Sequence, residues 1–307
     1  MVIGNTERMR ILIAGASGFL GTRLADTLRA DGHDVHRLVR REPRGADETR
    51  WDPARGHLDP TAVTGADAVV NLAGANINGR RWTTAYKKVL IDSRVDTTAT
   101  LATAIAAADR RPAVLLNASG IHFYGDRGDR TVDEQDPPGT GFLADLCRTW
   151  EAAAAPAEDA GVRVVHLRTS FPLDRDGGLL KPLLLVFRLG GGGRLASGRQ
   201  YMPWISLPDW LGATTMLLER QDIAGPVNLT GPEPATNAEF TAALGRAVHR
   251  PTLVPVPAFA LRAALGELGD WAVASLRATP GVLTTAGYAF RHRSVSSAIR
   301  WAVDHPQ

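Results

Sequence analysis

The sequence has one cysteine, Cys147, among its 307 residues. A single thiol excludes a disulfide within the chain and is typical of proteins in the reducing cytoplasm, where we expect this one. No apolar run approaches the roughly 20 residues that span a bilayer. The longest runs, 183–187 and 254–260, are far shorter. The sequence therefore predicts a cytoplasmic protein with no membrane partner.

Charge of one sign is also scarce. The 35 Lys and Arg residues are interspersed with 32 Asp and Glu residues, and the formal net charge is only +3. Because the chain has no basic tail or stripe, nucleic-acid binding is not expected. Residues 1–8 carry no periodic pattern, and we interpret them as a flexible leader.

Short apolar runs alternate with segments of helical spacing over residues 9–170. Strands are predicted at 10–14, 33–40, 67–74, 113–119 and 162–170, and helices at 19–32, 93–112 and 143–161. These strands are apolar enough to be buried on both faces of a sheet. The pattern therefore predicts an α/β fold with a doubly wound, Rossmann-like parallel sheet.

From residue 171 to residue 307, glycine and proline interrupt this pattern. Thr236 and Glu239 form a capping box ahead of a predicted helix at 238–249. A second helix is predicted at 259–278 and a short strand at 287–290. We expect 171–307 to form a smaller α/β lobe over the carboxyl edge of the sheet, with a ligand crevice between the two parts.

A glycine-rich turn follows the first strand. Gly15 permits a tight turn, Gly18 lets backbone N–H groups approach a pyrophosphate, and Gly21 lets the next helix pack close to the strand. The alternative is a turn that merely needs glycine. We predict a dinucleotide here, in contact with Gly15, Ser17, Gly18, Phe19, Leu20 and Gly21.

The second strand ends in Arg40 and Arg41, where an NAD-binding protein usually has a carboxylate. A guanidinium group suits a 2′-phosphate, so this pair predicts NADP(H) rather than NAD. Two solvated surface arginines are the alternative. We expect Trp51 and Asp52 to lie along the adenine, and the backbone of Leu72, Ala73 and Gly74 to pass the cofactor.

Five longer blocks carry a family resemblance. They are 123–129, 142–151, 167–178, 197–209 and 225–240. Together with the glycine turn, they resemble the extended short-chain dehydrogenase/reductases of the NAD(P)-dependent epimerase/dehydratase superfamily. The resemblance is greatest to an atypical, uncharacterised "epimerase family" subgroup that lacks the superfamily's Ser-Tyr-Lys triad.

The resemblance implies a Ser, a Tyr and a Lys that are missing here. Counting from Glu151, the Tyr position is Leu143 and the Lys position is Cys147. The Ser position is Gly120, and Ser119 precedes it, where we expect it to contact the cofactor. Any proton transfer must therefore use other groups. The loss matters, because a positioned general acid raises the reaction rate roughly 10²–10⁴-fold.

Other side chains are candidates for this chemistry. Tyr124, after the strand at 113–119, could donate a proton or only pack. Arg199 could hold an anionic group of the substrate and lower the pKa of Tyr124, or form a salt bridge at the rim. His122 is a second candidate for proton transfer, although a loop histidine is more often a surface residue. We interpret Cys147 as a small hydrophobic residue.

The substrate is less clearly indicated. The resemblance implies an arginine that holds the diphosphate of a nucleotide sugar, and Met202 occupies that position. No metal site is expected. We predict an NADP(H)-binding oxidoreductase or epimerase that acts on a small molecule without the triad. The alternative is a non-catalytic NADP(H)-binding regulator. A pocket between the lobes lined by Tyr124, Arg199 and Trp204 would favour the enzyme, and a filled pocket or an exposed apolar patch would favour the regulator.

Overall fold

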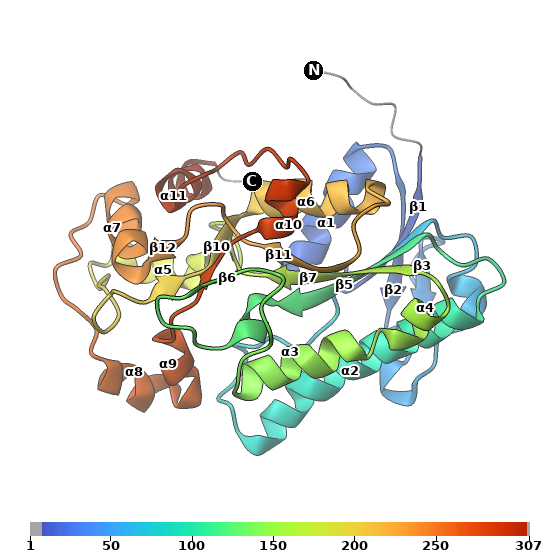
Figure 1. Ribbon diagram of the computed structural model, residues 1–307, viewed down its shortest axis with the longest axis horizontal. Coiled ribbons are helices and arrows are strands. Elements are labelled where there is room, and N and C mark those ends of the chain that lie inside the picture. Colours follow the sequence, from blue (N-terminus) through green and yellow to red (C-terminus); the bar gives the residue numbers. More distant parts are fainter. Residues whose placement is uncertain (1–7, 306–307) are drawn as a thin grey trace.

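A seven-stranded parallel β-sheet forms the centre of the computed structural model, which describes residues 8–305 (Figure 1). In chain order its strands are β1 (Arg10–Ala14), β2 (Asp34–Val39), β3 (Glu48–Arg50), β4 (Ala68–Asn71), β5 (Val114–Gly120), β7 (Arg163–Thr169) and β11 (Gly225–Leu229). In space the order is β11-β7-β5-β4-β1-β2-β3, with every neighbouring pair parallel. The predicted Rossmann-like fold is confirmed. Residues 1–7 of the predicted leader lie outside the described residues.

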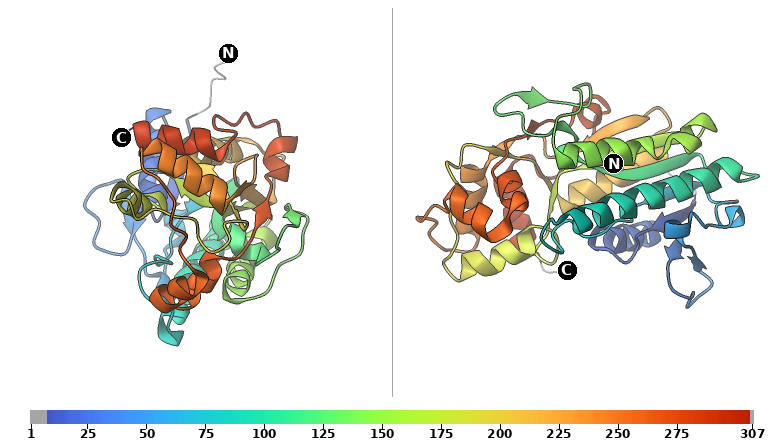
Figure 2. Two further views of the ribbon diagram at one scale, coloured as in Figure 1. Left: turned by 90° about the vertical axis from the view of Figure 1, so that its left-hand side faces the viewer. Right: turned by 90° about the horizontal axis from the view of Figure 1, so that it is seen from below.

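Helices cover both faces of this sheet (Figures 1 and 2). One face carries α1 (Phe19–Ala30), α6 (Leu207–Glu219) and α10 (Gly281–Thr285), and the other carries α2 (Thr84–Ala107), α3 (Phe142–Ala152) and α4 (Ala155–Asp159). Alternate residues of β1 enter the two cores: Ile11 and Ile13 pack toward α1 and α6, whereas Leu12 and Ala14 pack toward α2. This alternation is the period of a strand that is buried on both faces.

The remaining elements form the C-terminal lobe. Its helices are α5 (Leu180–Arg188), α7 (Asn237–Ala247), α8 (Ala258–Leu265), α9 (Glu267–Ala272) and α11 (Val295–Asp304). Its strand pairs are β8 (Phe171–Leu173) with β10 (Trp204–Ser206), and β9 (Tyr201–Met202) with β12 (Ala235–Thr236). A third pair joins β6 (Thr131–Val132) to β13 (Arg277–Ala278). Outside this lobe, short 3₁₀ turns connect elements of the sheet. They are η1 (Pro53–Arg55) and η2 (Pro60–Ala62), between β3 and β4, and η3 (Ile121–Tyr124), after β5.

The C-terminal part of the chain also returns to the sheet. β11 pairs with β7 as an outer strand, and α6 packs against α1. The residues that remain outside the sheet gather around their own core of α5, α7 and α11, and α11 lies beside α7 (Figure 1). The capping box at the start of α7 is confirmed, because Thr236 and Glu239 exchange hydrogen bonds through their side chains and backbone N–H groups.

Several predicted boundaries are wrong. The helix predicted at 93–112 begins earlier, at Thr84, where the Thr83 side chain caps α2. The helix predicted at 143–161 is two helices, and Pro156 lies in the first turn of the second. The helix predicted at 259–278 stops at Gly266, whose positive φ of 62° ends α8. The segment 287–290 is not a strand, and Tyr288 there donates a hydrogen bond to the Asp209 carbonyl.

The close approach of α1 to β1 depends on Gly21. A Cβ atom on this residue would lie 2.1 Å from the Gly15 carbonyl oxygen, which belongs to the backbone and cannot move aside as a flexible side chain would. We expect Gly21→Ala to lower the free energy of unfolding by about 1–3 kcal/mol, because the overpacked turn must shift. Urea denaturation measures this. Asp26→Ala, at an exposed position of the same helix, is the control and should change it by less than about 0.5 kcal/mol.

Candidate functional site

A cleft of about 880 Å³ lies at the carboxyl edge of the sheet, beside β1, β2 and β4. It is lined by the glycine turn, the end of β2, η1, the segment after β4 and one face of α2. Ten of the residues predicted to bind the cofactor meet here. They are Gly15, Ser17, Gly18, Arg40, Arg41, Trp51, Asp52, Leu72, Ala73 and Gly74. Their grouping is observed, and their contacts with a dinucleotide stay a prediction.

The turn is built for close backbone approach. Gly15 has a φ of 82°, and a Cβ atom on it would lie 2.6 Å from the Leu72 carbonyl carbon. Gly18 precedes α1, and no side chain caps that helix end. The first turn of α1 has no acidic residue. Its backbone N–H groups are therefore available to an anion, and the site fits the pyrophosphate of a dinucleotide.

Buried amides fix the opposite side of the turn. Asn71 accepts a hydrogen bond from the Ala73 N–H at 3.2 Å, and donates one to Asn117 Oδ1 at 2.9 Å. Thr98 also donates to Asn117 Oδ1. This network shapes the backbone after β4, and our sequence analysis missed it. Its signal in the sequence was an asparagine within each of two otherwise apolar strands, Asn71 at the end of β4 and Asn117 in the middle of β5.

The two arginines after β2 have different surroundings. Arg41 makes a two-pronged pair with Glu48 of β3, with both N–O distances at 2.7 Å. The Arg41 guanidinium, with the Arg44 N–H, lowers the pKa of Glu48 to about 2. Arg40 is exposed at the cleft and has no ion pair among the described residues. Arg40 is therefore the better placed of the two to bind a phosphate.

Four residues predicted to contact the cofactor lie outside this cleft. Phe19 packs on Gly177, where a Cβ atom would lie 2.1 Å from its ring. Leu20 packs against the sheet core, and Gly21 packs on the Gly15 backbone. Ser119 donates a hydrogen bond to Glu151 Oε1 at 2.6 Å. These residues build the walls behind the cleft.

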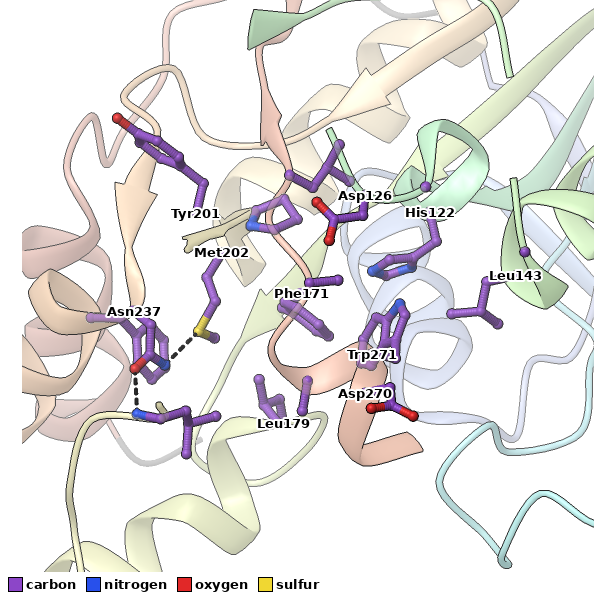
Figure 3. Close-up of a pocket in the computed structure, with 18 of the residues that line it drawn as sticks. His122, Asp126, Leu143, Phe171, Leu179, Tyr201, Met202, Asn237, Asp270 and Trp271 are labelled. Atoms are coloured by element: carbon purple, nitrogen blue, oxygen red, sulfur yellow. Dashed lines mark hydrogen bonds between the residues drawn. The ribbon is translucent and has the colours of Figure 1, made fainter. Parts of the chain in front are cut away.

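A second cavity, of about 400 Å³, lies between the sheet and the C-terminal lobe (Figure 3). Its walls are mostly apolar and aromatic and come from η3, α3, α5, α7, α9 and β9. Leu143, at the position of the missing Tyr, lines it (Figure 3). Because β4 and β5 are neighbours in the sheet, the cleft after β4 and the cavity after β5 open at the same edge.

His122 lines this second cavity, unlike the other two predicted catalytic residues. Its ring lies edge-on to Trp271, with 4.3 Å between centroids, and 5.7 Å from Phe171. Burial among these rings lowers the pKa of His122 to about 3. The imidazole is therefore neutral at pH 7. No described residue bonds to its ring nitrogens, so they remain available to a ligand.

Tyr124 is buried away from both cavities. Its hydroxyl donates to Asn228 Oδ1 at 2.8 Å and accepts from Arg168 Nη1 at 2.8 Å. Burial raises the pKa of Tyr124 to about 12. The expected pairing with Arg199 is wrong, because Arg199 is exposed and the cation beside the phenol is Arg168. This placement argues against Tyr124 as the proton donor.

Arg168 holds a buried network together. It binds both oxygens of Glu151, through Nε and Nη2, at 2.9 Å each, and stacks 3.5 Å from the centre of the Phe123 ring. Ser119 completes the group through Glu151. Our sequence analysis missed Arg168, although a charged residue within the apolar strand at 162–170 was a visible signal.

Cys147 lies beneath Gly120. A Cβ atom on Gly120 would lie 3.1 Å from the Cys147 sulfur. Burial raises the pKa of the thiol to about 12, so Cys147 is neutral at pH 7. It packs in one cluster with Ile121 and Tyr124. This agrees with its interpretation as a small hydrophobic residue.

No group of three or more His, Cys, Asp or Glu side chains in the described part of the chain could hold a metal ion. No described helix is both long enough and apolar enough to cross a membrane.

The fold and the two cavities define a dinucleotide-binding α/β protein of the extended short-chain dehydrogenase/reductase type. Residues 11–229 match the family model of the NAD dependent epimerase/dehydratase family, and the chain belongs to that family. Residues 256–302 match a model for a domain of unknown function. The resemblance found in the sequence is confirmed.

Individual relatives cover nearly the whole chain. It is 48% identical to Epimerase family protein MT2273 of Mycobacterium tuberculosis, over 96% of this chain and 98% of the relative. It is similar to the crystal structure of human epimerase family protein SDR39U1 with NADPH, with a TM-score of 0.90, 34% identity, and coverage of 97% of this chain and 100% of that one. It is also similar to the nucleoside-diphosphate sugar epimerase from Corynebacterium glutamicum, with a TM-score of 0.80, 32% identity, and coverage of 96% and 58%.

The position of Tyr124 leads to a prediction about stability. Tyr124→Phe leaves Arg168 and Asn228 each without one buried partner, so we expect the free energy of unfolding to fall by about 1–3 kcal/mol. NADPH affinity should stay within about threefold, because Tyr124 does not line the cofactor cleft. Urea denaturation and calorimetry measure the two quantities. Tyr201→Phe, on the cavity wall, is the control, and an equal loss of stability there would contradict the network's role.

Proposed function

We propose that this protein is an NADP(H)-dependent oxidoreductase that acts on a small molecule in the cavity between the sheet and the C-terminal lobe. The observation that carries the proposal is the pair of cavities at one sheet edge, with Arg40 at one and a neutral His122 at the other. The crystal structure of the human relative with NADPH supports the choice of cofactor. We also propose that the protein is located in the cytoplasm.

Different residues of this chain would bind different parts of the cofactor. The N–H groups at the start of α1 would hold the pyrophosphate, and Arg40 the 2′-phosphate. Trp51 and Asp52 line the same cleft and would flank the adenine. The bound cofactor would supply a hydride to a carbonyl carbon of the substrate, and water would supply the proton for the alcohol oxygen.

His122 would position and polarise the substrate. A neutral imidazole can donate an N–H hydrogen bond to a carbonyl oxygen, which stabilises the negative charge that develops there. The cavity gives this bond apolar surroundings, in which it is stronger than in water. We therefore assign His122 the role of hydrogen-bond donor, in place of the missing Tyr and Lys.

A non-catalytic regulator stays the second candidate, and one observation favours it. Large apolar side chains are exposed on the C-terminal lobe, among them Leu189, which follows α5, and Leu253, Val254 and Phe259. Such side chains are typical of partner-binding surfaces. The cavity between the lobes, however, is not filled by side chains, although Tyr124, Arg199 and Trp204 do not line it. An open cavity favours the enzyme.

The proposed role of Arg40 can be tested by cofactor binding. One charge-assisted hydrogen bond is worth about 1.5–3 kcal/mol, so Arg40→Ala should weaken NADPH binding roughly 10–100-fold. NADH affinity should hardly change, because NADH has no 2′-phosphate. Calorimetry with both cofactors measures this. Arg148→Ala, on the exposed side of α3, is the matched control. Equal affinity of the unmutated protein for NADPH and NADH would contradict the proposal.

The role of His122 can be tested by turnover with a carbonyl substrate. We expect His122→Phe to lower kcat by roughly 10²-fold, because the hydrogen-bond donor is lost, while NADPH affinity is unchanged. His122→Gln keeps an N–H donor and should recover part of the rate. A fully active His122→Phe variant would show that His122 is not the hydrogen-bond donor, and it would contradict this part of the proposal.

The pKa of His122 gives a separate prediction. Since burial lowers this pKa to about 3, the ring stays neutral throughout the range from pH 5 to pH 9. We expect the pH profile of kcat to show no step near 6.5 that disappears in His122→Gln. Such a step would show that His122 titrates near its ordinary pKa, and a loss of activity as the pH rises through it would mean that the imidazolium is the active form.

A further inference from the structure

We propose that the cavity between the lobes takes an uncharged, apolar carbonyl compound rather than a nucleotide sugar. The proposal rests on the function proposed above and names its substrate class. It starts from the walls of the cavity, where aliphatic and aromatic side chains predominate: Leu143, Phe171, Leu183, Phe187, Met202 and Trp271 (Figure 3). A cavity of about 400 Å³ is within the usual range for a small organic ligand.

The charge of the cavity opposes an anionic ligand. No Lys or Arg side chain lines it among the residues that the structure describes, whereas Asp126, Glu267 and Asp270 do. His122 adds no positive charge, because its pKa is lowered to about 3. A sugar diphosphate would bring negative charges into this environment without a cation to pair them, and an unpaired charge in apolar surroundings is costly.

Each of the three carboxylates already has a partner within the protein. Glu267 pairs with Lys87 of α2 at 2.5 Å, and Asp270 pairs with Arg262. Asp126 accepts hydrogen bonds from the backbone N–H groups of Gly128 and Ser275. These contacts hold the loop after η3 and the α8–α9 segment in place, so the carboxylates act as structural groups at the wall.

The side-chain amide of Asn237 also has its partners within the wall of the cavity. Its Oδ1 accepts from the Leu195 N–H at 2.7 Å, and its Nδ2 lies 3.2 Å from the Met202 sulfur, as the dashed lines in Figure 3 show. An amide that could have bound sugar hydroxyls therefore bonds within the wall. A polyol would lose its water-facing hydrogen bonds here and gain few in return.

His122 supplies the polar contact that remains. It lies on the side of the cavity away from Asn237, next to Leu143 and Trp271 (Figure 3). Its ring nitrogens make no bond to a described residue, so an acceptor oxygen on the ligand satisfies one of them. An apolar body that carries one carbonyl oxygen matches this distribution.

Binding can be tested without turnover. Benzylideneacetone, an uncharged apolar enone, and UDP-glucose serve as the two probes, with NADP⁺ present. Quenching of tryptophan fluorescence reports on the cavity, because Trp82 and Trp271 line it, and calorimetry gives the dissociation constants. We expect benzylideneacetone to bind at least about tenfold more tightly than UDP-glucose, because only the enone avoids burying unpaired charge. Tighter binding of UDP-glucose, or no binding of the enone at millimolar concentration, would overturn the proposal.

Two substitutions on one helix locate the site. Leu183 and Leu185 both belong to α5, but Leu183 lines the cavity, whereas Leu185 is 63% exposed and does not. Leu183→Lys should weaken benzylideneacetone binding at least about tenfold, and Leu185→Lys should leave it unchanged. NADPH affinity and circular dichroism confirm that both variants fold. Equal effects of the two substitutions would place the probe elsewhere and contradict the proposal.

A turnover measurement separates this proposal from the proposed function. If the enone binds in this pattern but is not reduced when NADPH is supplied, the substrate class stands and the oxidoreductase activity fails. If NADP⁺ is reduced when UDP-glucose is supplied, and NADPH is not oxidised with the enone, the oxidoreductase activity stands and the apolar substrate class fails.

Discussion

The buried pair between Arg168 and Glu151 is the interaction on which the arrangement of this site depends. It joins β7 to α3, reaches β5 through Ser119, and reaches η3 and β11 through Tyr124 and Asn228. A buried ion pair is tolerated only when both partners are fully hydrogen-bonded, and here each oxygen and most of the guanidinium N–H groups have partners. Removing one member would leave the others buried without a partner. The network therefore fixes the relative positions of β5, β7, β11, α3 and η3.

This network also decides which residues remain for chemistry. Tyr124 and Ser119 point into it, and their hydroxyl groups are used there. His122, two residues before Tyr124 in the same short turn, faces the cavity instead. A 3₁₀ turn directs neighbouring side chains to different sides. The buried Arg168–Glu151 pair therefore lies behind the site, and the cavity in front of it is lined mostly by apolar side chains, with no Lys or Arg among its described lining residues.

The sequence predicted ten of the residues that line the cleft beside the glycine turn, whereas it predicted few of those that line the second cavity. The glycine turn is a local pattern: Gly15 and Gly21 are needed for contacts within one strand–turn–helix unit, so spacing alone reveals them. Arg40 and Arg41 look equivalent in the sequence, and only β3 distinguishes them, because Glu48 binds Arg41. The second cavity brings together residues that are far apart in the chain: Leu143, Met202 and Trp271. No local sequence pattern predicts that these residues line one cavity.

The sequence by itself determined the fold class, the place of the dinucleotide cleft and the loss of the triad, because each depends on hydrophobic period or on residue identity at a fixed spacing. The tertiary structure alone decided the direction in which each side chain at the sheet edge points. Tyr124 is buried against Arg168 and Asn228, Arg199 lies on the surface, and His122 lies in an apolar cavity that makes it neutral. These differences arise from contacts between segments far apart in the chain, and such contacts form only when the lobes have packed together.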